Sequence, residues 1–509
     1  MIKMSRSRKL SILTIIVAGL GALTCRAEEF YVSQSGSGSK TGLDLSNAAP
    51  VSWLNSSANW ATGSGKISPG DTVNLSGTIT TPLQIAGDGT SGSPITIRFM
   101  PNAKLSAPYW DSTGAISASN LNYVTIDGGE NGRIEATANG TSRTYKQDPT
   151  FGVSITNAIG VTVKNLTVAG LYVRTPNSSD SRDDSKAIVV SGSVSNILIQ
   201  NCVVSDSKYG IVVAFTSSAS SGIGIQENKL IRTSTGIVVG SGGSSARASN
   251  VTVVANEISG CYAWDGSWTP PPGDGHHHSD GIHLWAVHTG SSISNCVVSR
   301  NRIGPDMGGF ITGWVFTEGP ISNLKVVNNL FTSDANSAPT NGFVAIKGNS
   351  ASPTLIANNT FTVGGKGTAV YVASSAAGSV TLKNNISKNA SAAVYLPRQS
   401  LASANGNLWS GTTAPRFYVD GVGRSWTDWK AMGFDSSGRT DDPIINLLTG
   451  EIGGLSPAID AALDLSTQFT DDLLGNQRPQ GGAWDIGAIE YTGASSSTPS
   501  APNSLSLTN

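Results

Sequence analysis

All five histidines of the chain fall within thirteen positions: His276, His277, His278, His283 and His288. Asp280 stands in the same stretch. Imidazole titrates near neutral pH, and a neighbouring carboxylate can orient and charge it, which suits general acid or base chemistry. The clustering therefore predicts a reactive centre built on His283 and Asp280, with His276 and His278 as substrate-binding residues beside it.

Three tryptophans flank the histidines, at Trp264, Trp268 and Trp285. The flat apolar face of an indole can pack against a sugar ring while its N–H group stays solvated. We therefore predict that these tryptophans bind a carbohydrate. The alternative is that this proline-rich loop packs on its own tryptophans and leaves its histidines in solvent.

The same loop carries ligand types that suit a transition metal. His276, His278 and His283, with Asp274 or Asp280, offer the nitrogen and oxygen ligands that zinc takes. However, three consecutive histidines on one loop cannot all face one ion, and the spacing matches no zinc motif that we can justify. Zinc is therefore the less favoured cofactor.

A second loop, SDSRDDSK, concentrates carboxylates at Asp180, Asp183 and Asp184. Such hard oxygen donors suit calcium, but the usual aspartate spacing around a central glycine is absent. We interpret the segment as a solvated acidic loop. Calcium stays open as an alternative cofactor.

A repeat between Val161 and Val394 indicates the elements that position these residues. An apolar strand, an Asn, a second apolar pair, a polar turn and an alternating strand recur at steps of 25 to 45 residues. Short strands at such a period stack as a solenoid, whereas a propeller blade needs about 40–45 residues and four strands. The pattern predicts an all-β parallel β-helix. The recurring asparagines are Asn165, Asn201, Asn228, Asn256, Asn301, Asn329, Asn359 and Asn384.

These asparagines have a structural explanation. Asn tolerates a left-handed turn, and its side-chain amide can bond to the Asn of the next coil in a ladder. We therefore expect the column to lie in the interior and to take no part in chemistry.

Two coils are longer than their neighbours, with their surplus at the same place in the coil: CYAWDGSWTPPPGDGHHHSD and LYVRTPNSSDSRDDSK. Long insertions in a solenoid leave at one face and commonly build its binding surface. The two loops are three coils apart, about 14 Å, which predicts a groove for a polymer chain. The short turns between them place Lys208, Tyr209 and Arg232 on the groove floor. Strand alternation turns His283 and Trp285 outward.

The two ends of the chain differ in character from its body. Residues 1–27 have the basic start, short apolar run and small residues of a signal peptide. We therefore expect a secreted protein, extracellular or periplasmic, although a lipoprotein attached through Cys25 is an alternative. Residues 28–492 form the predicted β-helix, and residues 493–509 a flexible Ser/Thr/Pro-rich tail. No later segment approaches the roughly 20 apolar residues of a membrane helix.

Charge and cysteine content narrow the functional classes. The chain has 33 basic and 34 acidic residues, and loss of the five basic residues of the leader leaves 28 against 34, a net charge of −6. A nucleic-acid-binding protein would show a basic surplus, so we expect no nucleic-acid partner. Cys202, Cys261 and Cys296 can form at most one disulfide, and we favour buried thiols.

Each end of the predicted solenoid needs a cover, because an open edge is free to pair with another chain. The segment from Ser52 to Gly65, with Trp53 and Trp60, predicts a cap over the first coil. The segment of about 416–492 predicts a cap at the other end.

Motifs near both ends carry a resemblance: YVSQSGSG at Tyr31, GDTV at Gly70, GLSPAIDAA at Gly454 and GNQRPQGGAWDIGAIEY at Gly475. They are similar to motifs of secreted bacterial right-handed parallel β-helix proteins of the pectate-lyase-like superfamily. The last two resemble the C-terminal segment of that superfamily's choice-of-anchor group. The resemblance implies a right-handed helix and a carbohydrate ligand. It implies no single reaction, because members include lyases, hydrolases, epimerases and non-catalytic surface proteins.

A polysaccharide lyase acting by β-elimination on a uronate-containing glycan is the function that we predict first. His283 or Lys208 would remove the proton next to a uronate carboxylate. Arg232 would neutralise that carboxylate. The prediction depends on Lys208 and Arg232 forming one cationic column that faces the histidine loop.

Two alternatives stay open. A glycoside hydrolase needs two carboxylates roughly 5 to 9.5 Å apart, for which Asp280 with Asp306 are the candidates and Asp265 is in reserve. A non-catalytic glycan-binding protein or adhesin would use the same groove without turnover. The sequence does not indicate the sugar or the oligomeric state.

Overall fold

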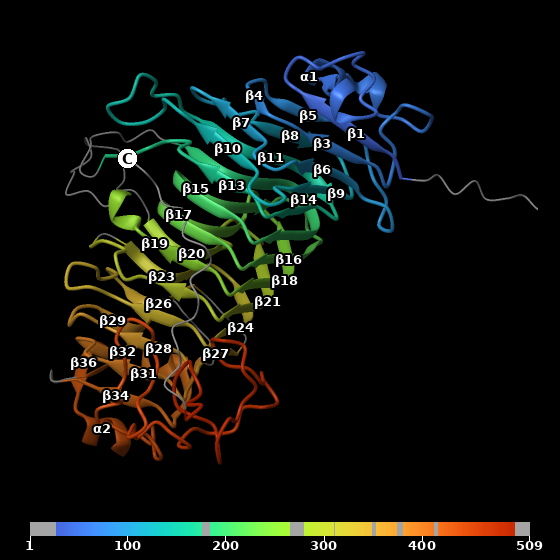
Figure 1. The fold of residues 1–509 in the computed structure, drawn as a ribbon. Helices are drawn as coiled ribbons and strands as arrows, with labels where there is room; N and C mark the ends of the chain where they lie inside the picture. Colours follow the sequence, from blue (N-terminus) through green and yellow to red (C-terminus); the bar gives the residue numbers. More distant parts are fainter. Residues whose placement is uncertain are drawn as a thin grey trace, which may run out of the picture.

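The computed structural model describes residues 27–175, 184–264, 279–309, 311–348, 353–373, 380–411 and 416–493. Over these residues the chain winds as a parallel β-helix whose successive coils stack strand on strand (Figure 1). The strands fall into three parallel sheets that run along the helix axis. The predicted fold class, an all-β right-handed parallel β-helix, is confirmed.

The bounds of the strands follow the three sheets in turn. The first sheet contains β1 (Glu29–Ser33), β3 (Thr72–Leu75), β6 (Ile95–Phe99), β9 (Val124–Asp127), β12 (Thr162–Lys164), the end of β14 (Ser185–Gln200), β16 (Ser220–Gln226), β18 (Arg247–Val254), β21 (Ser292–Ser299), β24 (Ile321–Val327), β27 (Thr354–Ala357), β30 (Val380–Lys383) and β33 (Leu401–Asn405). The second sheet contains β4 (Thr78–Ile79), β7 (Lys104–Ala107), β10 (Arg133–Ala136), β13 (Thr167–Ala169), the starts of β15 (Val203–Phe215) and β17 (Lys229–Ser241), β19 (Glu257–Ser259), β22 (Arg302–Ile303), β25 (Leu330–Thr332), β28 (Thr360–Thr362), β31 (Ile386–Lys388) and β34 (Leu408–Ser410). The third sheet contains β5 (Leu83–Ile85), β8 (Ile116–Ser119), β11 (Thr150–Ile159), the start of β14, the ends of β15 and β17, β20 (Ser279–Trp285), β23 (Ile311–Glu318), β26 (Gly342–Lys347), β29 (Thr368–Val372), β32 (Ala392–Leu396) and β35 (Phe417–Val419). Beside these, β2 (Ala49–Pro50) pairs with β1, and β36 (Val422–Arg424) is antiparallel to β35.

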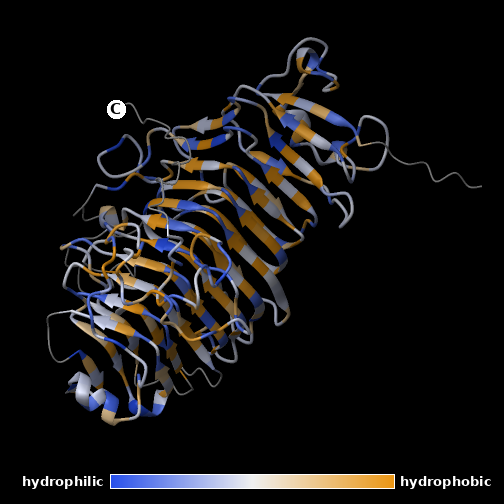
Figure 2. Ribbon diagram, turned by 60° about the horizontal axis from the view of Figure 1, so that its bottom comes forward, coloured by the Kyte–Doolittle hydropathy of each residue, from blue (hydrophilic) through white to orange (hydrophobic). Residues whose placement is uncertain are grey.

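The core fills the space between the three sheets. Hydrophobic and hydrophilic residues alternate along the strands, as Figure 2 shows, because successive side chains point to opposite faces of a sheet. The third sheet departs from strict alternation near the start of its strands. There Ala187 and the next residue, Ile188, are both fully buried in the core before the alternation resumes. The two inward residues in succession bend each strand, which shapes the outer face of this sheet.

A ladder of buried asparagines joins the first and second sheets. In each link an Asn side chain donates to the side-chain oxygen of the next coil's residue, at 2.8 to 3.1 Å. The last acceptor is Asp435, whose pKa is raised by burial. The predicted interior ladder is therefore confirmed. Its members are Asn228, Asn256, Asn301, Asn329, Asn359, Asn385 and Asn407.

Three of the predicted members do not belong to this ladder. Asn165, Asn201 and Asn384 occupy the preceding position in their coils, where the backbone is left-handed with φ of 57°, 50° and 55°. In the first two of these coils the ladder position is held by Leu166 and Cys202, which are buried in the core. This left-handed column forms links of its own, because Asn201 donates to Asn165 at 2.8 Å and Asn384 donates to Asn358 at 3.1 Å. The single column that we predicted is therefore two adjacent columns.

Both ends of the helix are covered. At the first coil α1 (Val51–Leu54) buries its apolar residues, and Trp60 donates its indole N–H to the Leu54 carbonyl at 2.6 Å. The short 3₁₀ turns are η1 (Leu45–Asn47), η2 (Ser57–Asn59), η3 (Cys261–Trp264) and η4 (Arg398–Ser400). At the other end α2 (Trp426–Ala431) packs Trp429 against Phe417, with ring centroids 4.6 Å apart.

After α2, the C-terminal segment of residues 439–493 returns along the side of the last coils (Figure 1). Its anchor is Arg478, whose side chain is fully buried and pairs with the equally buried Glu490. The guanidinium also donates to Asn328 and to the carbonyls of Asp471, Asp485 and Gly487. All five of its N–H donors therefore have acceptors.

The remaining sequence expectations concern cysteines and membrane helices. Cys202, Cys261 and Cys296 are buried free thiols, as we favoured. None of the helices in the described ranges has the length and apolar character needed to cross a bilayer.

Candidate functional site

A pocket of about 460 Å³ lies on the outer face of the third sheet, over β14, β15, β17, β20 and β23. Figure 1 shows these strands in the middle of the helix. The described ends of both long loops, at residues 175 and 184 and at 264 and 279, meet the coil at the head of this sheet. The pocket lies on the sheet that follows both loops, and the loops' remaining residues lie outside the described ranges, so a groove between the loops stays a prediction. Its lining residues are Asp184, Lys186, Tyr209, Val212, Ala214, Thr235, Val238, His283, Trp285 and Glu318.

Strand register explains why His283 stands out in this pocket. Val212, Val238, His283 and Phe316 are direct partners in successive strands, so they form one outward column. His283 thus replaces a valine among apolar neighbours, and its ring centroid is 5.0 Å from that of Phe316. The predicted outward direction of His283 and Trp285 is confirmed, because their strand neighbours Ile282 and Leu284 are in the core. The imidazole is nevertheless mostly covered, with 11% of the side chain exposed.

Two carboxylates bracket the imidazole. Asp280 Oδ2 lies 3.4 Å from His283 Nδ1, and Glu318 Oε2 lies 3.5 Å from His283 Nε2. The Asp280 side chain is fully buried, and its Oδ1 accepts a hydrogen bond from the Gly313 N–H at 3.1 Å. Asp280 therefore cannot reach a ligand directly and acts behind His283.

Glu318 is the residue that our sequence analysis missed. Its side chain is 23% exposed, lines the pocket and approaches Lys347 Nζ with Oε1 at 3.7 Å. The available signal was the strand of its coil, whose register aligns Phe316 with His283 and Glu318 with Trp285. Reading that strand on to residue 318 would have put a carboxylate beside the imidazole.

Of the predicted sugar-binding aromatic residues, two line the pocket. Trp285 is half-buried with its ring centroid 6.5 Å from that of His283, and Tyr209 lies two coils away along the axis. Trp264 does not fit the prediction. It is 2% exposed, donates its indole N–H to the Arg232 carbonyl at 2.8 Å and packs with Tyr172, so it holds the loop base in place.

The predicted cationic column is not formed. Arg232 makes a bidentate pair with Asp206, at 2.7 and 2.6 Å, and this hydrogen bonding raises the pKa of the guanidinium. Lys208 lies beside the pocket's Tyr209, with Nζ 5.5 Å from the ring centroid. Neither side chain is part of the pocket lining. The cation that does line the pocket is Lys186, which pairs with Asp184 at 2.5 Å.

The other carboxylate of the predicted hydrolase pair, Asp306, lies outside the pocket. Its Oδ1 accepts the Gly260 N–H at 2.9 Å. Asp306 and Asp280 both approach the Cys261 thiol, whose pKa is raised by burial and, to a lesser extent, by these two carboxylates. Because Asp280 is fully buried, the two do not flank a space that a sugar could enter. Asp265, Trp268, Asp274, His276 and His278 lie outside the described residues.

No group of three His, Cys, Asp or Glu side chains within the described ranges is arranged to hold a metal ion. Two of the predicted zinc ligands, His283 and Asp280, lie in the described ranges. They contact each other, and His283 also contacts Glu318. Of the predicted calcium ligands, Asp184 is described, and it pairs with Lys186. Asp180 and Asp183 lie outside the described residues.

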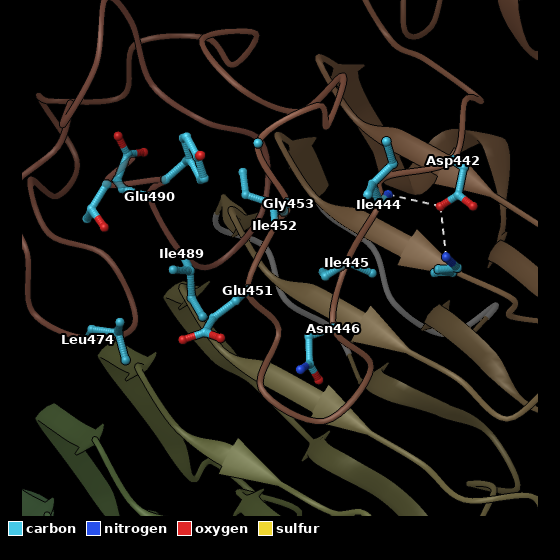
Figure 3. Close-up of a pocket in the computed structure, with 14 residues that line it drawn as sticks. Asp442, Ile444, Ile445, Asn446, Glu451, Ile452, Gly453, Leu474, Ile489 and Glu490 are labelled. Atoms are coloured by element: carbon cyan, nitrogen blue, oxygen red, sulfur yellow. Dashed lines mark hydrogen bonds and ion pairs between the residues drawn. The ribbon is translucent and has the colours of Figure 1, made fainter. Parts of the chain in front are cut away.

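A second cavity, of about 580 Å³, lies under the C-terminal segment (Figure 3). Its lining combines aliphatic residues, Ile444, Ile452 and Ile489 among them, with the carboxylates of Asp442, Glu451 and Glu490. Asp442 at its rim pairs with Lys388 at 2.8 Å and accepts the Ile444 N–H. Glu490 pairs with Arg478 and Asp442 with Lys388, so two of the three carboxylates in this lining already hold the C-terminal segment in place.

Comparisons with known proteins find likeness in structure alone. No family model matches the sequence, and no curated protein does. Among solved structures, the chain is similar to a GH136 lacto-N-biosidase from Eubacterium ramulus, with TM-score 0.47 and 12% identity over 82% of this chain and 67% of that one. It is similar to pectate lyase Pel9A, with TM-score 0.44 and 13% identity over 91% and 96% of the two chains. It is also similar to a polygalacturonase from Erwinia carotovora ssp. carotovora, with TM-score 0.42 and 13% identity over 82% and 100%. These proteins differ in activity, so the likeness concerns the fold.

Proposed function

We propose that the protein cleaves a glycan in the pocket of the third sheet, with Glu318 as the group that exchanges a proton with the substrate. The observation that carries the proposal is the row Asp280, His283 and Glu318, which leads from a fully buried carboxylate to one that lines the pocket. A positioned carboxylate can act as a general base, and its geometry here is set by the imidazole and the buried carboxylate behind it.

The roles follow from burial. Glu318 is the exposed member and would contact the substrate, whereas His283 and Asp280 are positioning residues behind it. The contacts of 3.4 and 3.5 Å are longer than the roughly 2.7–3.2 Å of a well-formed hydrogen bond. Such contacts often tighten when substrate binds, so their length is compatible with catalysis. Trp285 would contribute a wall for a sugar ring.

Elimination is the reaction that we favour. A lyase needs one base and a cation for the uronate carboxylate, and here Glu318 would be the base and Lys347 the cation, which contacts Glu318 from outside the pocket lining. A hydrolase needs two carboxylates about 5–9.5 Å apart that reach the sugar. The other carboxylate lining the pocket, Asp184, is four coils from Glu318, about 19 Å at the spacing of strands. The preference for a lyase now depends on Glu318 and Lys347 in place of Lys208 and Arg232.

The test is to incubate the purified full chain with polygalacturonate, alginate, hyaluronan and neutral xyloglucan. Absorbance of unsaturated uronates and release of reducing ends are followed separately, so that elimination and hydrolysis give different signals. Glu318→Gln should lower turnover about 10²- to 10⁴-fold, because loss of a general base has that cost. Its control is Glu257→Gln, which changes a carboxylate paired with Lys229 on the second sheet and should keep wild-type turnover.

The outcomes separate the candidate functions. Reducing ends without unsaturated product would make the protein a hydrolase, and binding without any product would make it a glycan-binding protein or adhesin. Wild-type turnover in Glu318→Gln would place the reaction elsewhere on the helix.

We further propose that the mature protein acts outside the cytoplasm, after removal of residues 1–27. A polymer substrate is compatible with such a location. N-terminal sequencing of the protein recovered from periplasm and culture medium of an expressing bacterium should find a chain that begins near Glu28. An intact Met1 in both fractions would contradict the proposal.

A further inference from the structure

The outward column that contains His283 continues toward the C-terminal end of the third sheet. Register carries it from His283 through Phe316 and Ala345 to Tyr371, Tyr395 and Tyr418 in successive coils. The three tyrosines, which we call the tyrosine ladder, overlap with ring centroids 5.3 and 5.6 Å apart and planes 25° apart. At the spacing of strands the ladder begins about 14 Å beyond His283 and ends about 24 Å beyond it.

The tyrosine ladder is accessible and its polar ends are unoccupied. Tyr395 is 37% exposed, and Tyr371 and Tyr418 are half-buried on either side of it. Within the described part of the chain, none of the three phenol hydroxyls has a hydrogen-bond partner. A tyrosine usually finds such a partner when it is covered, so these hydroxyls are left to solvent or to a ligand.

Position and chemistry together indicate one kind of occupant. A row of aromatic surfaces and hydroxyl groups, at one per coil, matches a polymer that offers C–H faces and hydroxyl groups at regular intervals along its length. The row lies in the same column as the pocket, and the two members between them, Phe316 and Ala345, are fully buried. A chain that follows the helix axis would therefore meet the pocket and the ladder as two separate contact surfaces. The ring at each step is neutral, so the contact needs no charged group on the sugar.

We propose that the tyrosine ladder binds further sugar units of the glycan whose reacting end lies at Glu318, and that the protein therefore recognises a long linear segment. The inference rests on the proposed function, because it takes the ligand of the pocket as the ligand of the ladder. It adds a binding surface that begins three coils away from the reacting group and that favours long chains over short ones.

The experiment is native affinity electrophoresis of the full chain in gels that contain polygalacturonate, alginate, hyaluronan or xyloglucan. On the polysaccharide that retards the wild-type protein, Tyr395→Ala should weaken binding about tenfold, because it removes a ring and a hydroxyl together. Tyr395→Phe keeps the ring, so its affinity should lie between that of the wild type and that of Tyr395→Ala. The matched control is Tyr109→Ala, which removes a tyrosine of the same 37% exposure that also contacts another ring, Tyr145.

The variants also separate this proposal from the proposed function. Weaker retardation of Tyr395→Ala with normal retardation of Tyr109→Ala supports the ladder, even if Glu318→Gln shows that no cleavage depends on the pocket. Equal retardation of Tyr395→Ala and wild type would overturn the ladder while leaving cleavage at Glu318 intact. A wild-type protein that none of the four polysaccharides retards would overturn the ladder. A melting temperature measured for each variant excludes misfolding as the cause of a loss.

Discussion

The cluster around Arg478 and the cluster around His283 both bury ionisable groups. They differ in how completely those groups are hydrogen-bonded. Around Arg478, every guanidinium donor has an acceptor, and Glu490 accepts in turn from the N–H groups of Gln480 and Asp485. Around His283, the two contacts to carboxylates are 3.4 and 3.5 Å long, and Glu318 opens to a pocket.

The difference teaches how to tell structural charges from working ones in the same fold. A closed network whose members are all satisfied fixes a segment in place, and removing one member leaves the others buried without compensation. In a row that ends at a pocket and has long contacts, a bound ligand can shorten those contacts and complete the site. We therefore expect changes near Arg478 to act on stability and changes near His283 to act on turnover.

The largest expected effect is on the stability of the closed network. Arg478→Met should lower the free energy of unfolding by about 3–5 kcal/mol, because Glu490 would stay buried without its cation. Chemical denaturation followed by circular dichroism measures the loss, and turnover below the melting transition should stay near wild type. The control is Arg300→Met, which breaks a half-exposed pair with Asp471 and should cost less than about 1 kcal/mol. Equal losses in the two variants would remove the contrast between them.

At the open row, the expected effect is on rate. His283→Ala should reduce turnover about 10²-fold, because Glu318 would lose the group that orients it. The pH profile of kcat/KM should shift as well, since the side chain in contact with Glu318 is removed, and a purely structural role would not move that profile. His283→Gln, which retains a hydrogen-bonding side chain, should recover part of the rate. If His283→Ala lost as much stability as Arg478→Met and kept the wild-type pH profile, His283 would not be a positioning residue for Glu318.

The smallest expected effect is a pH dependence within the closed network. Burial is the main cause that raises the pKa of Asp485 to about 6. Because this value lies above the unfolded value of about 3.9, Asp485 favours the fold when protonated. Its contribution is therefore full below about pH 4 and is lost as the pH rises through about 6.

Thermal melts of wild type and Asp485→Asn between pH 4 and 8 measure this contribution, which we expect to be on the order of 1 kcal/mol. The variant should lose that part of the pH dependence, whatever its absolute melting temperature. Parallel curves for the two proteins would show that Asp485 does not titrate in this range.

The fold could be predicted because its signal is repeated in every coil. Asn at one place per coil, with apolar strands on both sides, indicated the stack and the interior ladder. The assignment failed by one residue at Asn165, Asn201 and Asn384, because Asn is favoured both at left-handed turns and in ladders. Two adjacent positions with the same preference cannot be separated by residue type alone.

The candidate site was predicted only in part, and the reason is again register. His283 and Trp285 were predicted to face outward because alternation determines which side chains do so, whereas Tyr209 was predicted from its position between the two loops. Glu318 was missed because only the long-range pairing of its strand with β20 places it beside His283. Arg232 and Asp206 pair across two neighbouring coils, so no local sequence motif predicts this contact.

The return of the C-terminal segment along the coils has a consequence for how the molecule comes apart. Asn328, Asn358 and Asn384, in three successive coils, each donate a side-chain hydrogen bond to a backbone carbonyl of this segment. A stack in which each coil touches only its neighbours can fray from its end, one coil at a time. A strap bonded to three coils makes their opening a single event, so we expect amides of β24, β27 and β30, the strands that these asparagines follow, to exchange with solvent together rather than in order from the terminus.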